Sequence, residues 1–270
     1  MKNYICRTCG VQYASAEAPP PGCIICDDER QYVGWDGQQW LTMAEMRTRG
    51  YRNEIREHEP RLLGIGTEPR FAIGQRSLLL QSDSGNLLWD PISYIDDETI
   101  QRVNGAGGIQ AIAASHPHFY GAMVDWSRTF ADAPIYVPED DQQWVTRPDP
   151  MIKLWNGTVQ LFPDVTLIQC GGHFPGSAVV HWATGAEGRG ALLVGDSITV
   201  VQDRRFVSFM WSYPNVIPLS EPDVRHIVEA VAPYPFDRIY GGWWGSIVQD
   251  NGSQSVARSA ERYINRIRGH

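Results

Sequence analysis

Short apolar runs, separated by glycine, proline and polar residues, make up most of the chain after residue 60. Runs of this length with turn formers between them are typical of strands rather than long helices. The expected strands are Leu62–Ile65, Phe71–Ile73, Leu78–Leu80, Leu87–Trp89, Ile109–Ala114, Ile135–Val137, Val165–Gln169, Ala178–Ala183 and Ala191–Val194.

Segments with helical character lie between these runs. They are Asp97–Asn104, Ala122–Phe130, Glu221–Val231 and Arg258–Arg268. Because strands alternate with helices along the chain, the pattern predicts an α/β domain.

The first part of the chain follows a different pattern. Tyr4–Trp40 is rich in turn formers, including three prolines and a glycine at residues 19–22, and it is too short of apolar runs to form a core alone. Thr42–His58 has the character of a polar helix or connector, with Thr42 as its N-cap and Glu45 in the capping-box position. The expected domains are therefore a small one at residues 1–58 and a large one at residues 59–270.

Composition narrows the class of protein. The 270 residues are 43% apolar and 20% charged, which excludes a disordered or fibrous chain. The formal charge of −8, without a compensating block of Lys and Arg, makes nucleic acid an unexpected partner. No apolar run is long enough to cross a membrane, and residues 1–13 lack the apolar stretch of a targeting signal. We expect a soluble, cytoplasmic protein.

Four of the five cysteines lie within the first 26 residues, in two C-x-x-C pairs separated by thirteen residues. Two residues between thiolates allow a tight turn to direct both sulfurs at one ion, and two such turns complete a tetrahedron. We therefore expect Cys6, Cys9, Cys23 and Cys26 to bind a metal rather than to form disulfides. Cys170 stands alone far downstream, and we expect it to be buried and inert.

The segment around the first pair resembles the first metal-binding turn of rubredoxins and zinc ribbons, with Tyr4 before C-x-x-C-G and Tyr13 after it. In the second pair, Ile24 and Asp27 replace the usual Pro and Gly of rubredoxins. This departure favours structural Zn²⁺ over an iron that transfers electrons.

Three of the seven histidines occur where predicted strands end. His116 and His118 follow the run Ile109–Ala114, and in extended chain residues i and i+2 face the same side. His173 follows the strand Val165–Gln169, and Asp196 follows the last strand. Ligands gather where the strands of an open α/β sheet end, so we expect one shared metal site, for zinc or ferrous iron.

Each of these side chains taken alone has a simpler explanation, such as a buried hydrogen bond for a histidine or a turn cap for Asp196. The combination favours the metal site. The remaining histidines have only the simpler explanation; they are His58, His181, His226 and His270.

From Pro60 onward the chain resembles the metallo-β-lactamase superfamily. The matching pieces are the early strand ending in Asp90, the H-x-H element at residues 116–118, the G-H-x-P-G turn at residues 172–176 and the G-D pair ending in Asp196. The resemblance implies a four-layer αββα sandwich of two packed sheets with helices outside, preceded here by the small four-cysteine zinc-ribbon domain. It also implies that His116, His118 and His173 hold a metal with Asp196 beside it.

The resemblance is incomplete at the second metal. The family's motif continues as H-x-H-x-D-H, but Tyr120 and Gly121 occupy the Asp and His positions, and residues 240–245 provide no late histidine. We therefore expect a mononuclear site.

A zinc ion with an open fourth position lowers the pKa of its bound water to about 7. The resulting hydroxide could attack an ester, thioester or lactone carbonyl, with Asp196 orienting the water or accepting its proton. Tyr120 is a candidate proton donor, although a core aromatic is the more common role for such a residue. Asp125, in the following helix, is interpreted as a surface charge.

Two other functions stay open. A mononuclear non-haem iron oxidoreductase is one, because two histidines and a carboxylate form its usual ligand set and the sulfur dioxygenases of the same superfamily are similar here. The other is a non-catalytic metal-binding protein that kept the fold. Four tryptophans are expected in loops near the site: Trp211, Trp243, Trp244 and Trp126. They favour an apolar or aromatic small-molecule substrate, although ordinary core packing explains them equally well. A homodimer is compatible with the sequence.

Overall fold

The computed structural model describes residues 1–269, and His270 lies outside them. The chain forms two compact units. The first contains residues 1–137 and 142–154, and the second contains residues 138–141 and the part of the chain from Trp155 onward. The expected domain boundary after residue 58 falls inside the first unit and stays a prediction.

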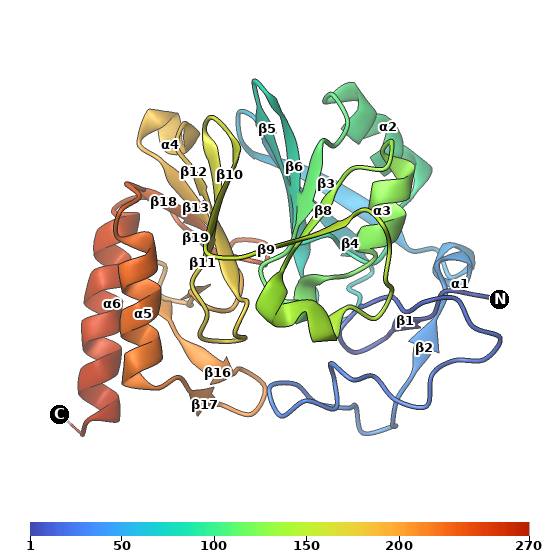
Figure 1. Ribbon diagram of the computed structural model, residues 1–270, viewed down its shortest axis with the longest axis horizontal. Helices are drawn as coiled ribbons and strands as arrows, with labels where there is room; N and C mark the ends of the chain where they lie inside the picture. Colours follow the sequence, from blue (N-terminus) through green and yellow to red (C-terminus); the bar gives the residue numbers. More distant parts are fainter. Residues whose placement is uncertain (270) are drawn as a thin grey trace. The chain divides into compact units, whose positions relative to one another are not determined.

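The first unit is built on one mixed sheet, with seven strands in the order β3-β4-β5-β6-β7-β8-β9 among the described residues (Figure 1). Strands β3 to β6 are antiparallel, and β6, β7 and β8 are parallel. The strands are β3 (Arg52–Glu59), β4 (Leu62–Glu68), β5 (Arg76–Ser82), β6 (Gly85–Trp89), β7 (Ala111–Ala113), β8 (Ile135–Pro138) and β9 (Ile152–Trp155). The central strands are apolar and buried on both faces, which is why continuous apolar runs predicted them.

Helices and turns connect these strands. They are α2 (Asp97–Gly105), the 3₁₀ turns η1 (Pro117–Phe119) and η2 (Glu139–Trp144), and α3 (Met123–Thr129). The side chain of Asp96 caps α2 by accepting a hydrogen bond from the Thr99 backbone N–H at 2.8 Å.

The four-cysteine segment belongs to the first unit. Its short strands β1 (Ile5–Cys6) and β2 (Trp40–Leu41) pair with each other and lead into α1 (Met43–Thr48). The predicted capping box is confirmed, because Thr42 accepts from the Glu45 N–H at 3.2 Å and the Glu45 carboxylate accepts from the Thr42 N–H at 2.7 Å. One apolar cluster joins this segment to the unit; it contains Ile5, Leu41, Met46, Phe71 and Tyr94.

The second unit is built on a sheet with the strand order β10-β11-β12-β13-β18-β19. Its strands are β10 (Thr158–Phe162), β11 (Val165–Gln169), β12 (Ala178–Trp182), β13 (Ala191–Leu193), β18 (Arg238–Tyr240) and β19 (Ile247–Val248). Two small ribbons follow β13, formed by β14 (Thr199–Val200) with β15 (Val207–Ser208) and by β16 (Met210–Ser212) with β17 (Ile217–Pro218).

The helices of the second unit are α4 (Gly185–Gly188), α5 (Glu221–Val231) and α6 (Gly252–Ile267). Figure 1 shows α5 and α6 side by side. Their apolar faces join the sheet in one core that includes Leu192, Ile227, Ile239 and Ile264.

Two predicted elements were wrong. The helix that begins after Thr42 ends at Thr48, and residues 52–59 form strand β3 instead. This strand is polar because it is the edge of its sheet, where only one neighbour supplies hydrogen bonds and solvent covers the rest. Phe71–Ile73 is a turn, closed by a hydrogen bond from the Gly74 N–H to the Phe71 carbonyl at 2.9 Å.

Other predicted strands and helices are confirmed with shifted ends. The last helix begins at Gly252 rather than at Arg258. No helix within residues 1–269 combines the length and the apolar character needed to cross a membrane.

Candidate metal centres

The four cysteines of the first segment are brought together. Their sulfur atoms lie within 4.8 Å of one another, with 3.5 Å between the Cys6 and Cys26 sulfurs and 3.7 Å between those of Cys9 and Cys23. All four side chains are buried and all four are thiols rather than disulfides. A buried, compact set of four sulfurs fits a tetrahedral metal ion.

Local contacts favour the thiolate form at Cys6 and Cys23, whereas burial raises the pKa of Cys9 and the neighbouring Cys23 thiol raises the pKa of Cys26. Hydrogen bonding from the neighbouring thiols of Cys23 and Cys26 lowers the pKa of Cys6, and the Cys26 thiol likewise lowers the pKa of Cys23. Gln38 donates its amide N–H to the Cys6 sulfur at 3.2 Å. Donors of this kind stabilise the negative charge of metal-bound thiolates.

In the first unit, His116 and His118 form a pair of buried imidazoles. Their ring centroids are 5.0 Å apart and the ring planes are nearly perpendicular. The predicted reason for their proximity was wrong, because only His116 is extended, and η1 starts at Pro117 and contains His118. The 3₁₀ turn, rather than strand alternation, brings the two rings to the same place.

The residues around this pair fix its geometry. Ser115 Oγ lies 2.9 Å from His116 Nδ1, and the Ser115 N–H donates to the Asp90 carboxylate at 2.6 Å. When His116 Nδ1–H donates to Ser115, its Nε2 lone pair is left for a metal. Gly121 follows the turn with φ +47°, and a Cβ there would meet the Pro91 carbonyl oxygen at 1.9 Å, so only glycine fits.

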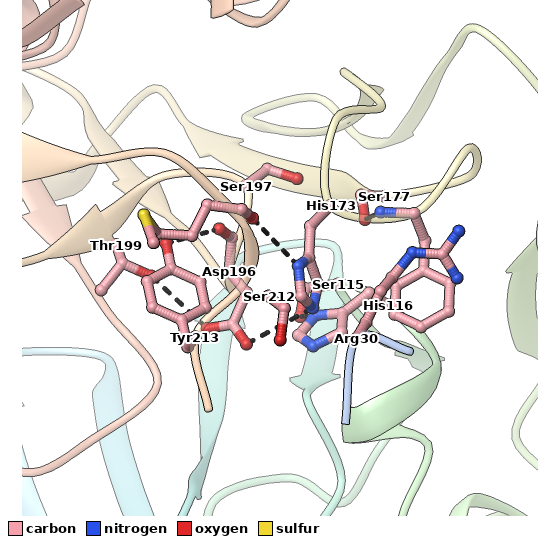
Figure 2. Close-up of polar contacts among 12 residues, drawn as sticks. Arg30, Ser115, His116, His173, Ser177, Asp196, Ser197, Thr199, Ser212 and Tyr213 are labelled. Atoms are coloured by element: carbon pink, nitrogen blue, oxygen red, sulfur yellow. Dashed lines mark hydrogen bonds and ion pairs between the residues drawn. The ribbon is translucent and has the colours of Figure 1, made fainter. Parts of the chain in front are cut away.

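In the second unit, His173 and Asp196 form another buried pair. His173 Nε2 lies 3.7 Å from Asp196 Oδ2, and Figure 2 shows the two side chains pointing toward each other. His173 Nδ1 lies 3.1 Å from the Met210 carbonyl, which accepts a hydrogen bond only if Nδ1 carries the proton. The Nε2 atom is therefore the one available as a ligand.

The loop that carries His173 is closed on itself. The Cys170 and Gly171 N–H groups both donate to the Ser177 carbonyl at 2.9 Å, and the Phe174 N–H donates to Ser177 Oγ at 2.8 Å. Gly172 has φ +85°, and a Cβ there would meet the Ile227 side chain at 2.6 Å. The turn is thus fixed by its own hydrogen bonds and by its packing on α5.

The loop that carries Asp196 is linked to the loop of His173. Ser197 Oγ donates to the Gly171 carbonyl at 2.7 Å. Tyr213 donates its hydroxyl to the Asp196 backbone carbonyl at 2.9 Å, and Thr199 Oγ1 lies 3.4 Å from Asp196 Oδ1 (Figure 2). Burial, with the Asp196 charge second, raises the pKa of Tyr213 well above its usual value, so this hydroxyl stays protonated.

The donor types of the two pairs suit zinc or ferrous iron. His116, His118, His173 and Asp196 each offer one nitrogen or carboxylate oxygen, and each is buried. The supporting residues Ser115 and Tyr213 were missed by the sequence analysis. The serine directly before H-x-H was a usable signal for Ser115, whereas no local pattern indicated Tyr213.

Three further residues were interpreted from the sequence: Tyr120, Asp125 and Cys170. Tyr120 is buried and, with Val11 and Thr146, lines a cavity of about 10 Å³ in the first unit. The interpretation of Asp125 as a surface charge was wrong, because its carboxylate pairs with Arg147 at 2.6 Å and is only 28% exposed. Burial raises the pKa of the Cys170 thiol to about 12, in agreement with an inert cysteine.

The prediction that four tryptophans lie in loops is confirmed for two of them and wrong for the other two. Trp126 lies in α3, fully buried, and donates its indole N–H to the Ile92 carbonyl at 2.8 Å, so it is a core residue of the first unit. Trp211 lies in β16. Trp243 and Trp244 follow β18 in a loop, and both side chains are partly exposed.

Histidines outside the two pairs have ordinary structural roles. His181 lies in β12 and its Nε2 is 2.8 Å from the Pro235 carbonyl, while burial lowers its pKa. His58 lies in β3, and burial lowers its pKa to about 4. His226 is exposed on α5.

Known structures resemble the chain across both units. The crystal structure of VMB-1 matches with a TM-score of 0.59 and 11% identity, covering 80% of this chain and 98% of that one. The DIM-1 metallo-β-lactamase has a TM-score of 0.57 at 13% identity, with 78% of this chain and 98% of that chain covered. For the Rm3 metallo-β-lactamase the TM-score is 0.51 at 17% identity, and the match covers 77% and 90% of the two chains.

These likenesses, together with the buried cysteine cluster, define the class of protein. The chain has the metallo-β-lactamase fold, with a zinc-ribbon-like four-cysteine segment at its N-terminus. No family model matches the sequence. The chain is 50% identical over 266 residues to the uncharacterized protein YmaE of Bacillus subtilis (strain 168), covering 98% of this chain and 96% of YmaE. It belongs to the same family as YmaE.

Proposed function

We propose that the chain is a metal-dependent hydrolase, and that His116, His118, His173 and Asp196 together bind one zinc or ferrous ion. The observation that carries this proposal is the orientation of the imidazoles within each unit. The Met210 carbonyl holds His173 with Nε2 available as a ligand, and Ser115 can do the same for His116. Hydrogen bonds of this kind typically support histidines that ligate a metal.

A single metal ion is the stoichiometry we propose for this site. The residues after His118 that would serve a second ion in the superfamily motif are Tyr120 and Gly121. Neither an aromatic phenol nor a glycine replaces a carboxylate and an imidazole as ligands for zinc. Hydrolysis that depends on a bridging metal pair is therefore not part of the proposal.

The metal, when bound, would polarise a substrate carbonyl and lower the pKa of water toward neutrality. Asp196 is proposed to orient the attacking water or to accept its proton, and its Thr199 and Tyr213 contacts hold the residue in position. Tyr120 is the proposed donor to the developing negative charge or to the leaving group.

The proposed substrates are small esters, thioesters or lactones. Trp211, Trp243 and Trp244 of the second unit are partly exposed, and aromatic side chains of this kind favour an apolar or aromatic group on the substrate. The four cysteines of the first segment are proposed to hold a structural Zn²⁺, because their sulfurs form a closed set and leave no open ligand position.

The test is turnover of a panel of aryl esters, thioesters and lactones by zinc-loaded protein and by His173→Ala. We expect kcat/KM of His173→Ala to fall about 10³-fold, because the variant loses a metal that would stabilise the transition state by several kcal/mol. The matched control is His226→Ala, which removes an exposed imidazole of the same unit and should leave the rate unchanged.

Two outcomes contradict the proposal. Equal rates for the wild type and His173→Ala would show that the metal site does not take part in catalysis. Oxygen consumption by iron-loaded protein, without hydrolysis of any member of the panel, would favour the oxidoreductase instead.

A further inference from the structure

The chain leaves the first pair of cysteines and runs directly against the turn that follows His118. Gln12 is three residues beyond Cys9, and its backbone N–H donates to the Gly121 carbonyl at 3.0 Å. Gly121 in turn is three residues beyond His118, and the Pro91 carbonyl leaves no space for a Cβ there. One hydrogen bond therefore joins the four-cysteine segment to the turn that carries two proposed ligands.

The side chain of Gln12 makes a second connection to the same region. It is 3% exposed, and its amide N–H donates to the Asp125 carboxylate at 2.6 Å in the first turn of α3. Arg147 donates to the Gln12 amide oxygen and also, at 2.6 Å, to Asp125. The buried amide is satisfied on both sides by a charged partner, which makes its position costly to change.

The backbone of the metal-binding turn is held by further donors of the first unit. Ser93 Oγ donates to the Gly10 carbonyl at 2.6 Å, and Gln75 donates its amide N–H to the Cys9 carbonyl at 3.3 Å. Thr146 Oγ1 donates to the Gln12 carbonyl at 2.8 Å. Residues 9–12 thus have one defined position against the unit that contains His116 and His118.

We infer that Gln12 is a positioning residue, which couples the metal held by the four cysteines to metal binding at His116 and His118. The inference rests on the proposed function, since it concerns the same histidines. A metal at Cys6 and Cys9 fixes the turn that leads into Gln12, and Gln12 fixes both ends of the segment between Gly121 and α3. The metal-bound four-cysteine segment therefore holds the turn that carries His118 in position.

The experiment uses Cd²⁺ as the probe and cadmium NMR as the readout. Sulfur ligands shift the cadmium resonance far from the position produced by nitrogen and oxygen ligands, so the two sites are observed separately. We expect two resonances from the wild type. In Gln12→Ala the four-sulfur resonance should be retained, while the Cd²⁺ dissociation constant of the second site rises about tenfold.

The matched control is Gln39→Ala. Gln39 lies in the same segment, and the hydrogen bond that its side chain accepts comes from Arg7 rather than from α3. It should leave both cadmium sites unchanged. Thr146→Val provides a second variant, because it removes only the donor to the Gln12 carbonyl and keeps the side-chain shape. It should raise the same dissociation constant by a smaller factor.

The outcomes separate this inference from the proposed function. A single four-sulfur resonance in the wild type would overturn both. Two wild-type resonances, with unchanged affinity at the second site in Gln12→Ala and Thr146→Val, would overturn only the coupling. An equal loss of affinity in Gln12→Ala and Gln39→Ala would also overturn it, because general destabilisation of the segment would then explain the result.

Discussion

The two sets of metal donors differ in how the chain assembles them. The cysteines lie between residues 6 and 26 in one unit, and two tight turns suffice to bring them together. The histidines and Asp196 extend from residue 116 to residue 196, with one pair in each unit. The first set depends on local chain geometry, whereas the second depends on the whole fold.

This difference predicts different consequences for stability and function. A segment too small to form its own core depends on its metal for folding. Ligands held at the ends of strands in large sheets are supported by cores that do not need the ion. Loss of a cysteine ligand should therefore reduce stability, and loss of a histidine ligand should mainly reduce metal affinity and turnover.

The largest effect is expected from Cys9→Ser. It should lower the free energy of unfolding by about 4 kcal/mol or more, because the remaining thiols are left buried without a complete metal site. Denaturant unfolding, monitored together with metal content, measures this. Cys170→Ala is the control, as a buried cysteine outside both sites, and its cost should be near 1 kcal/mol. An equal loss of unfolding free energy in the two variants would show that the metal does not stabilise the segment.

Gly121→Ala is expected to have the next largest effect. The added Cβ would lie 1.9 Å from the Pro91 carbonyl oxygen, so the turn after His118 must move. We expect a loss of about 3 kcal/mol in unfolding free energy. Gly157→Ala is the matched control, since Gly157 also has a positive φ of 63° but no atom within 4 Å of the added Cβ. It should cost about 1 kcal/mol, and a larger cost than that of Gly121→Ala would contradict the close approach.

Ser115→Ala should leave stability nearly unchanged and weaken metal binding. It removes the hydroxyl that lies 2.9 Å from His116 Nδ1. Such a loss typically lowers metal affinity about tenfold. Competition with a chelator measures the effect, and the exposed Ser84→Ala is the control. Unchanged affinity in Ser115→Ala would show that the serine does not orient His116.

The smallest effect concerns Cys170. At pH 8 a thiol with a pKa of about 12 is ionised in only about one molecule in 10⁴. After removal of metal by a chelator, titration with a thiol reagent should find four reactive cysteines, and the fifth only after denaturation. Rapid reaction of five thiols in the folded, metal-free protein would contradict the burial of Cys170.

The sequence was sufficient to predict the central strands of both sheets. Runs such as Leu78–Leu80 and Ala191–Leu193 are buried throughout, so they are apolar without interruption. Strand β3 was missed because this edge strand consists mostly of charged and polar residues and has no apolar run. The ribbons β14–β15 and β16–β17 have strands of only two or three residues, which are too short to show any period.

The candidate ligands were predictable, but the contacts that support them were predictable only in part. Cysteine spacing and the H-x-H element are local signals, so sequence alone identified them. Gln12 and Asp125 are 113 positions apart, and no local pattern indicates that they meet. Asp125 consequently resembled an ordinary helix surface charge until the fold placed Gln12 and Arg147 beside it.

The central claim is the proposal that His116, His118, His173 and Asp196 bind one ion in addition to the ion held by the cysteines. Elemental analysis of purified wild type, His116→Ala and His173→Ala tests it most directly. We predict about two ions per chain in the wild type and about one in each variant, since each variant removes a proposed ligand of the same ion. A wild type with a single ion, or variants that both keep two, would contradict the claim.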